Sequence, residues 1–285
     1  MKINKIVSVC CKKDIETWKT AARYIIQNIE SEAYLVIVPD NEIKFFQESS
    51  PAHYQVHGES KYTNTFQAYL RAKIPRGQES RYGWYLQQFI KLSAIREFGN
   101  DELILIWDSD TVPLKKLSFY ENKCVRHYIA IEHHQPYFDF ITKLNGLPKK
   151  VAYSFISQCL AIKGKWSVHF FADIEKRHGK PWHEAMIDCI DFHEASGFSE
   201  YETLGTFIQH HYPNEIVAVK DKWYRYGNAR IGKVENLSFF FFRCLLWPHN
   251  FVSFENWDRP YRDYEINISE IFRRIKNKIL TKWRS

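Results

Sequence analysis

Two carboxylates, Asp108 and Asp110, directly follow an apolar run at residues 104–107 and are separated by one serine. Residues i and i+2 of an extended strand share a face and lie about 6–7 Å apart, so both side chains could meet one divalent cation or its water shell. Oxygen ligands of this kind suit Mg²⁺ or Mn²⁺ better than zinc. A cation held there could neutralise a diphosphate and stabilise the charge on a departing nucleotide.

The same D-x-D pattern also has a purely structural interpretation. Carboxylates at the end of a strand are common in solvated turns and helix caps. The buried strand before Asp108 and the Pro113 after it favour the functional interpretation. In open α/β sheets, ligands bind outside the carboxyl ends of the strands, which is where these carboxylates would lie.

Hydrophobic periodicity predicts the elements that position the carboxylates. Strands are predicted at residues 6–10, 34–38 and 104–107, and helices at residues 14–29 and 82–98. The β-α-β opening predicts parallel strands with a right-handed crossover, and therefore an α/β fold with a mostly parallel sheet. The opening lacks G-x-G-x-x-G, which argues against a Rossmann dehydrogenase.

The rest of the chain predicts a helical elaboration of this sheet. Residues 53–79 are polar, and we interpret them as a mobile loop near the site with a short strand at 54–57. Strands are predicted at residues 127–131, 159–162, 215–219 and 238–246, and helices at 137–144, 166–178, 183–195 and 200–211. Without repeats or low-complexity linkers, residues 1–262 are expected to form one domain, with a nucleotide-binding half at about 1–112 and an acceptor half at about 113–262.

Three motifs occur in a characteristic order along the chain. They are WYLQQFIKL at 84–92, WDSDTVPL at 107–114 and FSEYE at 198–202. Over roughly residues 3 to 250 the sequence resembles the DxD glycosyltransferases of the A-type (GT-A) fold, and within them a bacterial group tied to surface polysaccharide synthesis, such as lipopolysaccharide or capsule. The resemblance implies a Rossmann-related nucleotide-binding sheet, a nucleotide-sugar donor, Mn²⁺ or Mg²⁺, and a glycan or lipid-linked acceptor.

The resemblance also suggests residues for the donor site. Asp110 would chelate the metal that bridges the donor phosphates, with Asp108 on the ribose or the metal. Asp40 would contact the base or ribose, although a turn-forming role after Pro39 is equally compatible with the sequence. By position alone, His249 would complete the metal shell. Four cations are candidates for the phosphates, although each taken alone is more typical of a surface charge: Arg71, Lys73, Arg81 and Lys91.

Two glutamates are candidates for the base that takes a proton from the acceptor hydroxyl. Glu200 and Glu202 lie in FSEYE, and a base here would suit an inverting single displacement. Ser199 and Glu202 also form an S-x-x-E capping box, which would occupy Glu202 structurally. Glu200 is therefore the preferred base. No residue identifies itself as the nucleophile of a retaining route.

Aromatic and histidine side chains are candidates for the acceptor cleft. The His133-His134 and His210-His211 doublets lack the partners of a zinc site and are interpreted as surface or cleft residues. The sequence does not separate an acceptor platform from the core for six aromatic residues: Tyr137, Phe138, Trp166, Trp182, Trp223 and Tyr224.

Composition limits the partners and the compartment. The 285 residues carry a formal net charge of +7 and have 16% aromatic residues, which suggests an anionic partner and ring-lined clefts. No nucleic-acid-binding motif is present, so nucleic acid is not an expected partner. The six cysteines form no C-x-x-C and are interpreted as reduced core thiols of a cytoplasmic protein. The apolar stretch at the start of the sequence is too short for the core of a signal peptide, which also favours the cytoplasm.

The final segment, residues 263–285, predicts a basic amphipathic helix. Its apolar positions share a helical face, while arginines and lysines fall mostly elsewhere. Such a helix could lie on the anionic inner face of the cytoplasmic membrane or pack on the domain.

Two other classes of function use the same features. A metal-dependent nucleotidyltransferase or phosphohydrolase would also use paired aspartates, but residues 10–13 are not a glycine-rich loop and the D-x-D follows the fourth strand, not the first. A non-catalytic sugar-binding module on this fold would show no metal-dependent nucleotide binding.

Overall fold

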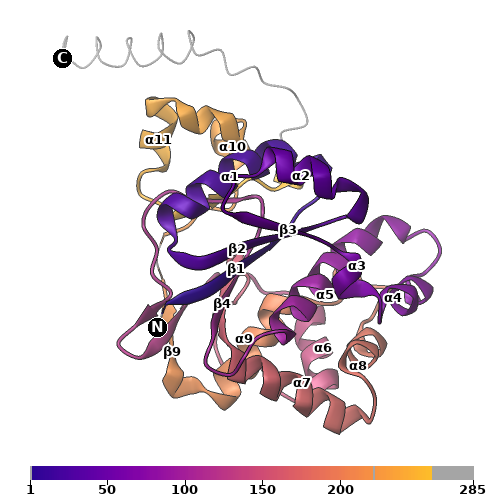
Figure 1. The fold of residues 1–285 in the computed structure, drawn as a ribbon. Helices are drawn as coiled ribbons and strands as arrows, with labels where there is room; N and C mark the ends of the chain where they lie inside the picture. The colour runs from indigo at the N-terminus through magenta and orange to yellow at the C-terminus, as the bar shows by residue number, and fades with distance from the viewer. Residues whose placement is uncertain (1, 221, 259–285) are drawn as a thin grey trace, which may run out of the picture.

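The computed structural model describes residues 2–220 and 222–258. Its centre is a five-stranded sheet with the order β3-β2-β1-β4-β8 (Figure 1). The strands are β1 (Ile3–Val9), β2 (Ser31–Val38), β3 (Tyr54–Gly58), β4 (Leu103–Trp107) and β8 (Cys159–Lys163). The first four are parallel and β8 is antiparallel to β4, which confirms the predicted α/β class.

The β-α-β opening forms as its periodicity predicts. Helix α1 (Ile15–Asn28) buries Trp18, Ala22 and Ile25 on one face, so the predicted helix at 14–29 is confirmed. Every residue of β4 and β8 is buried, which is typical of strands covered on both faces of a sheet.

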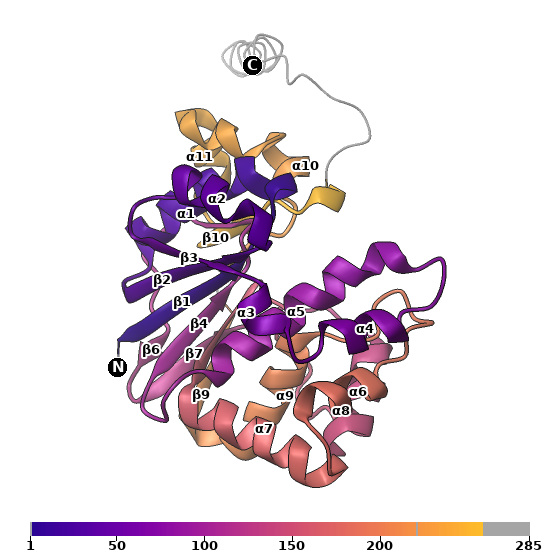
Figure 2. The same cartoon turned by 45° about the vertical axis from the view of Figure 1, so that its right-hand side comes forward.

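Helices cover the two faces unequally. In Figures 1 and 2, α1 and α2 (Ile43–Ser49) lie on one side of the sheet and a larger helical group lies on the other. The larger group contains α5 (Tyr82–Arg96), α6 (Gln135–Asn145), α7 (Gly164–His178), α8 (Trp182–Cys189) and α9 (Glu200–His211). Helix α5 runs directly into β4, and α9 packs against β8.

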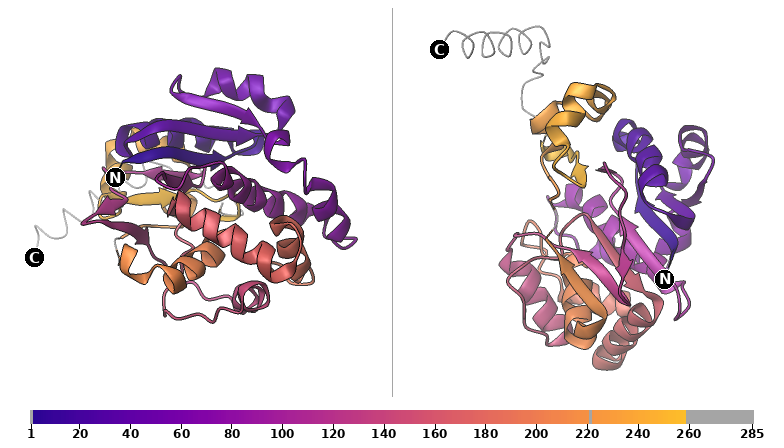
Figure 3. Two further views of the ribbon diagram at one scale, coloured as in Figure 1. Left: turned by 60° about the horizontal axis from the view of Figure 1, so that its bottom comes forward. Right: turned by 90° about the vertical axis from the view of Figure 1, so that its left-hand side faces the viewer.

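Two small sheets complete the fold. Strand β5 (Thr111–Pro113) pairs antiparallel with β10 (Phe251–Ser253). Strands β6 (Tyr120–Glu121), β7 (Cys124–Tyr128) and β9 (Ile216–Val219) form the other sheet. The β5–β10 pair brings residues near position 254 back to the D-x-D turn. In the right view of Figure 3, the orange segment that precedes β10 lies at the upper edge of the molecule, whereas β10 itself is buried.

Three sequence predictions of local structure are corrected here. Residues 53–79 are not mainly a loop: besides β3 they form α3 (Ser60–Thr63) and α4 (Gln67–Lys73), which bury Tyr62 and Leu70. Residues 238–246 are not a strand but the end of a 3-10 helix, Val234–Ser238, followed by α11 (Phe240–Leu246). Helix α8 ends at Cys189, not at 195. A short apolar run fits a strand or a helical turn equally well, so periodicity alone could not distinguish them.

The remaining general predictions have mixed outcomes. All six cysteines are free; Cys10, Cys159 and Cys189 are buried as expected, but Cys244 is exposed. None of the helices within the described ranges is long and apolar enough to cross a bilayer. The predicted helix at 263–285 lies outside the described residues.

Candidate active site

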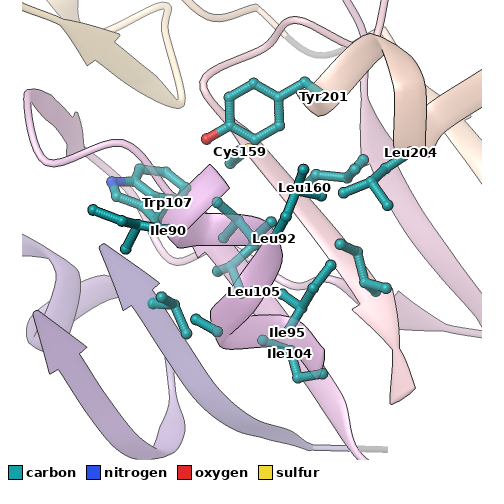
Figure 4. Close-up of a cluster of buried hydrophobic side chains, with 14 of the residues drawn as sticks. Ile90, Leu92, Ile95, Ile104, Leu105, Trp107, Cys159, Leu160, Tyr201 and Leu204 are labelled. Carbon is teal, nitrogen blue, oxygen red and sulfur yellow. The ribbon is translucent and has the colours of Figure 1, made fainter. Parts of the chain in front are cut away.

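The D-x-D turn lies at the carboxyl end of the parallel strands, held by the core beneath it. Trp107 is fully buried in the cluster of Figure 4, with Leu105 of the same strand and Leu160 of the neighbouring β8. Its indole Nε1 donates to the carbonyl of Thr111 at 2.7 Å, and the amide of Thr111 donates to the carbonyl of Asp108 at 3.0 Å. The turn is therefore fixed at both ends, and Asp108 follows β4 directly, as predicted.

A buried lysine links Asp108 to Glu200. The Nζ of Lys91 lies 2.5 Å from Asp108 Oδ1 and 2.7 Å from Glu200 Oε1. Burial alone would lower the pKa of Lys91, but the two carboxylates raise it above its usual value, so the ammonium stays charged. The Tyr201 hydroxyl also donates to Asp108 Oδ1 at 2.7 Å. Lys91 thus lies inside the site but is bound to carboxylates, so its geometry is that of a residue that positions Asp108.

Helix α9 begins at this network and holds both candidate bases. The amide of Glu200 donates to Gln88 Oε1 at 3.0 Å, and burial raises the pKa of the Glu200 carboxyl. Ser199 accepts the amide hydrogen of Glu202 at 3.3 Å, which confirms the predicted N-cap. The Glu202 carboxylate points elsewhere: its partners are Lys149, the Ser154 hydroxyl and the amide of Phe155. Both glutamates are therefore held by other side chains.

Asp110 lies among like charges. Burial first, and then the charges of Asp108, Glu255 and Asp14, raise the pKa of Asp110 well above its usual value; Lys91 is the opposing cation. The amide of Phe254 donates to the Asp110 carbonyl at 2.9 Å, which explains why Glu255 lies close by. Repulsion between buried carboxylates is relieved when a divalent cation binds nearby, so this charge distribution would favour a hard cation such as Mg²⁺ or Mn²⁺.

Sequence reasoning missed Glu255 and Asp14. Glu255 accepts from Arg225 Nε at 2.6 Å, and Arg225 also pairs with Glu132. The Asp14 carboxylate accepts from Asn256, so the start of α1 and the end of the described chain meet here. In the sequence, Asp14 lies 94 residues before Asp108 and 241 residues before Glu255. Only tertiary pairing brings them together, and no local signal marks them.

Comparison with protein-family models assigns the chain to a family. The model of DUF6492, described as a family of unknown function, matches residues 11–225. The chain belongs to this family. No curated protein matches it.

Solved structures similar to this DUF6492 member are glycosyltransferases. Mouse xyloside xylosyltransferase 1 in its apo form aligns with a TM-score of 0.50 and 10% identity, over 92% of this chain and 100% of that one. The galactosyltransferase LgtC with donor and acceptor sugar analogues aligns with a TM-score of 0.49 and 12% identity, over 91% of this chain and 90% of that one. The glycosyltransferase GlyE of Streptococcus pneumoniae TIGR4, in its apo form, aligns with a TM-score of 0.44 and 12% identity, over 92% of this chain and 57% of that one. The match to the xylosyltransferase supports a GT-A fold.

Four other predicted donor-site residues have structural partners in this DUF6492 member. Asp40 accepts from the amide and hydroxyl of Ser60, at 3.2 and 2.7 Å, and so anchors the start of α3. The other three are cations held by side chains outside the carboxylate cluster: Arg71 lies over the Tyr82 ring, Lys73 pairs with Asp188 at 2.7 Å, and Arg81 donates to Ser196 and lies over Trp84. The contacts of the three cations match their surface-charge alternative, whereas the Asp40 carboxylate bonds to a residue 20 positions away and not within a local turn.

The β5–β10 register places His249 away from Asp110. Ser253 pairs with Thr111 and Phe251 with Pro113, so His249 lies toward the opposite end of β10. The His249 ring packs against Tyr224 instead. In residues 2–220 and 222–258, no group of three or more His, Cys, Asp or Glu side chains is arranged closely enough to hold a metal ion by itself.

The predicted acceptor residues divide into core and partly exposed groups. Tyr137, Phe138, Trp166 and Trp182 are buried, so they belong to the core and not to a surface platform. Trp223 and Tyr224 are partly exposed. The histidine doublets form local contacts: His134 donates to the carbonyl of Ser196, and His210 donates to that of Pro148.

Proposed function

We propose that this protein is a metal-dependent glycosyltransferase that moves a sugar from a nucleotide-sugar donor to a glycan or lipid-linked acceptor. The observation that supports the proposal is the carboxylate cluster around Asp110 at the carboxyl end of β4, on a fold shared with a xylosyltransferase. Bound Mn²⁺ or Mg²⁺ would supply charge neutralisation at the donor diphosphate. Asp108 and Asp110 are the residues proposed to hold it, with oxygens of the donor phosphates as further ligands.

The residues around the carboxylates have positioning roles in this proposal. Lys91 and Tyr201 fix one oxygen of Asp108, leaving the other oxygen for a ligand. Glu200 in turn holds Lys91. To act as a base, Glu200 would have to release Lys91, so the geometry supports Glu200 as a positioning residue and leaves the inverting prediction without structural support. The proposal is therefore sugar transfer with either inversion or retention of configuration at the anomeric carbon.

The wider setting of the reaction rests on the sequence resemblance. We propose that the protein extends a bacterial surface polysaccharide, such as lipopolysaccharide or capsule, from the cytoplasmic side of the membrane. The donor sugar and its base are left for the binding experiment to determine.

Calorimetric titration of UDP, GDP, CDP, ADP and CMP, with and without Mn²⁺, tests the proposed function. We expect one diphosphate to bind only with Mn²⁺, and to lose that binding in Asp110→Ala. The matched control is Asp101→Ala, because Asp101 is an exposed aspartate before the other end of β4 and binding should be unchanged there. Binding that survives without metal or in Asp110→Ala would overturn the metal site, and no binding by any nucleotide would favour a non-catalytic module.

Turnover of the matching nucleotide sugar then distinguishes the remaining alternatives. A glycosyltransferase transfers the sugar to an added acceptor, or slowly to water, and releases the nucleoside diphosphate. Conversion of the nucleotide sugar and added pyrophosphate to the nucleoside triphosphate and sugar 1-phosphate would instead indicate a nucleotidyltransferase. Release of the nucleoside monophosphate and sugar 1-phosphate would indicate a phosphohydrolase.

A further inference from the structure

Helix α11 and the residues that flank it carry exposed aromatic side chains. Phe239, Phe240 and Trp247 are 51%, 74% and 72% exposed. On the inner side, Phe242 and Leu246 are buried against the 3-10 helix Val234–Ser238. The segment is therefore anchored, yet it presents large apolar side chains to solvent. Figures 1 and 3 show α11 at the periphery of the molecule.

Basic side chains surround these aromatic residues. The Nζ of Lys115 lies 5.5 Å from the Trp247 ring centroid. The nearby His249 has its pKa lowered, first by burial and then by the positive charges of Arg230, Lys115 and Lys222. From residue 226 to residue 250 the chain has three basic side chains and one acidic side chain, Glu235. We call these residues the aromatic-basic surface: Phe239, Phe240 and Trp247, with the basic residues Lys115, Lys222 and Arg230 beside them.

We propose that the aromatic-basic surface docks on an anionic lipid bilayer. Tryptophan and phenylalanine favour the boundary between headgroups and acyl chains, and lysines and arginines beside them are attracted to anionic lipids. This inference does not depend on the proposed sugar transfer. It concerns described residues of α11 and its surroundings, not the segment after residue 258.

Charge argues against two other occupants of the surface. Residues 259–285 contain eight Lys or Arg and three Asp or Glu, so this segment is itself basic and is not complementary to the surface. A second copy of the chain would bring like charge to like charge. An anionic partner meets neither difficulty, and the apolar Phe239 and Phe240 side chains favour lipid over a nucleic acid.

The first test is co-sedimentation of the full chain with phosphatidylcholine vesicles, with and without phosphatidylglycerol. We expect binding that requires phosphatidylglycerol, and that weakens by about tenfold or more in Phe240→Ser/Trp247→Ser. Both replaced side chains are exposed, so folding should be retained. The matched control is Ile131→Ser/Val217→Ser, which removes exposed apolar side chains elsewhere and should bind as the unmodified chain does.

A probe on α11 separates this surface from any contribution of residues 259–285. Cys244 is exposed on α11, and an environment-sensitive fluorophore can be attached there after Cys11→Ser and Cys124→Ser. A blue shift with anionic vesicles is expected. Vesicle binding without a shift, binding unchanged in Phe240→Ser/Trp247→Ser, or binding to a DNA duplex but not to vesicles would each overturn the proposal.

Discussion

Replacing Lys91 with methionine should strongly destabilise the protein. The lysine side chain is 4% exposed, and its ammonium lies between Asp108 and Glu200, whose side chains are 18% and 4% exposed. Removing one partner of a buried ion pair costs about 3–5 kcal/mol, because the remaining charge stays buried without compensation. In a chain of this size 1 kcal/mol corresponds to about 2 °C, so the melting temperature should fall by about 6–10 °C.

Thermal and urea unfolding, followed by circular dichroism, would measure the effect of Lys91→Met. The matched control is Lys19→Met, which removes an exposed ion pair to Glu16 and should cost at most about 0.5 kcal/mol. The double variant Lys91→Met/Glu200→Gln should recover about 1–3 kcal/mol, because the amide removes one uncompensated charge. If Lys91→Met costs no more than Lys19→Met, the buried network does not stabilise the fold as argued.

Divalent cations provide a second readout on the same variant. Without the lysine, Asp108 loses the positive charge next to it and keeps Tyr201 as the partner of Oδ1, so the carboxylate should attract a cation more strongly. If the carboxylate cluster binds a cation, the rise in melting temperature caused by Mn²⁺ should be larger for Lys91→Met than for the unmodified protein. Equal shifts would contradict the metal site without affecting the stability argument.

Three further predictions concern other parts of the fold. His127 is buried and burial lowers its pKa from 6.5 to about 4, so the unfolded chain takes up a proton first as the pH falls. Stability should therefore decline between about pH 6.5 and pH 4, by at most about 3 kcal/mol from this residue, and urea titrations across that range should show a smaller decline in His127→Leu. A Cβ on Gly205 would lie 2.1 Å from Phe155, so Gly205→Ala should cost about 1–3 kcal/mol in the same assay, whereas Gly83→Ala, which meets open space, should be neutral or stabilising by up to about 1 kcal/mol. Ser199→Ala removes the N-cap of α9 and should cost about 1 kcal/mol; an unchanged urea midpoint would show that the cap is dispensable.

Local sequence patterns were enough to predict the strands and helices that frame the site. Alternating and continuous apolar runs are local signals, because strand and helix periods are carried by neighbouring residues. They predicted β1, β2, β4, α1, α5 and α9, and with them the position of Asp108 and Asp110 at the carboxyl end of the sheet. The S-x-x-E pattern likewise predicted Ser199 as the cap of α9, because capping is a contact within one turn.

Only the tertiary structure decided what surrounds those carboxylates. Lys91 bonds with partners 17 and 109 residues away, and the β5–β10 pair brings Glu255 toward Asp110 while carrying His249 toward the opposite end. Strand pairing and register select these neighbours, and neither is encoded in local spacing. The apolar run at 238–246 became α11 for a related reason: a short run fits either period, and packing against the 3-10 helix Val234–Ser238 determined which one formed.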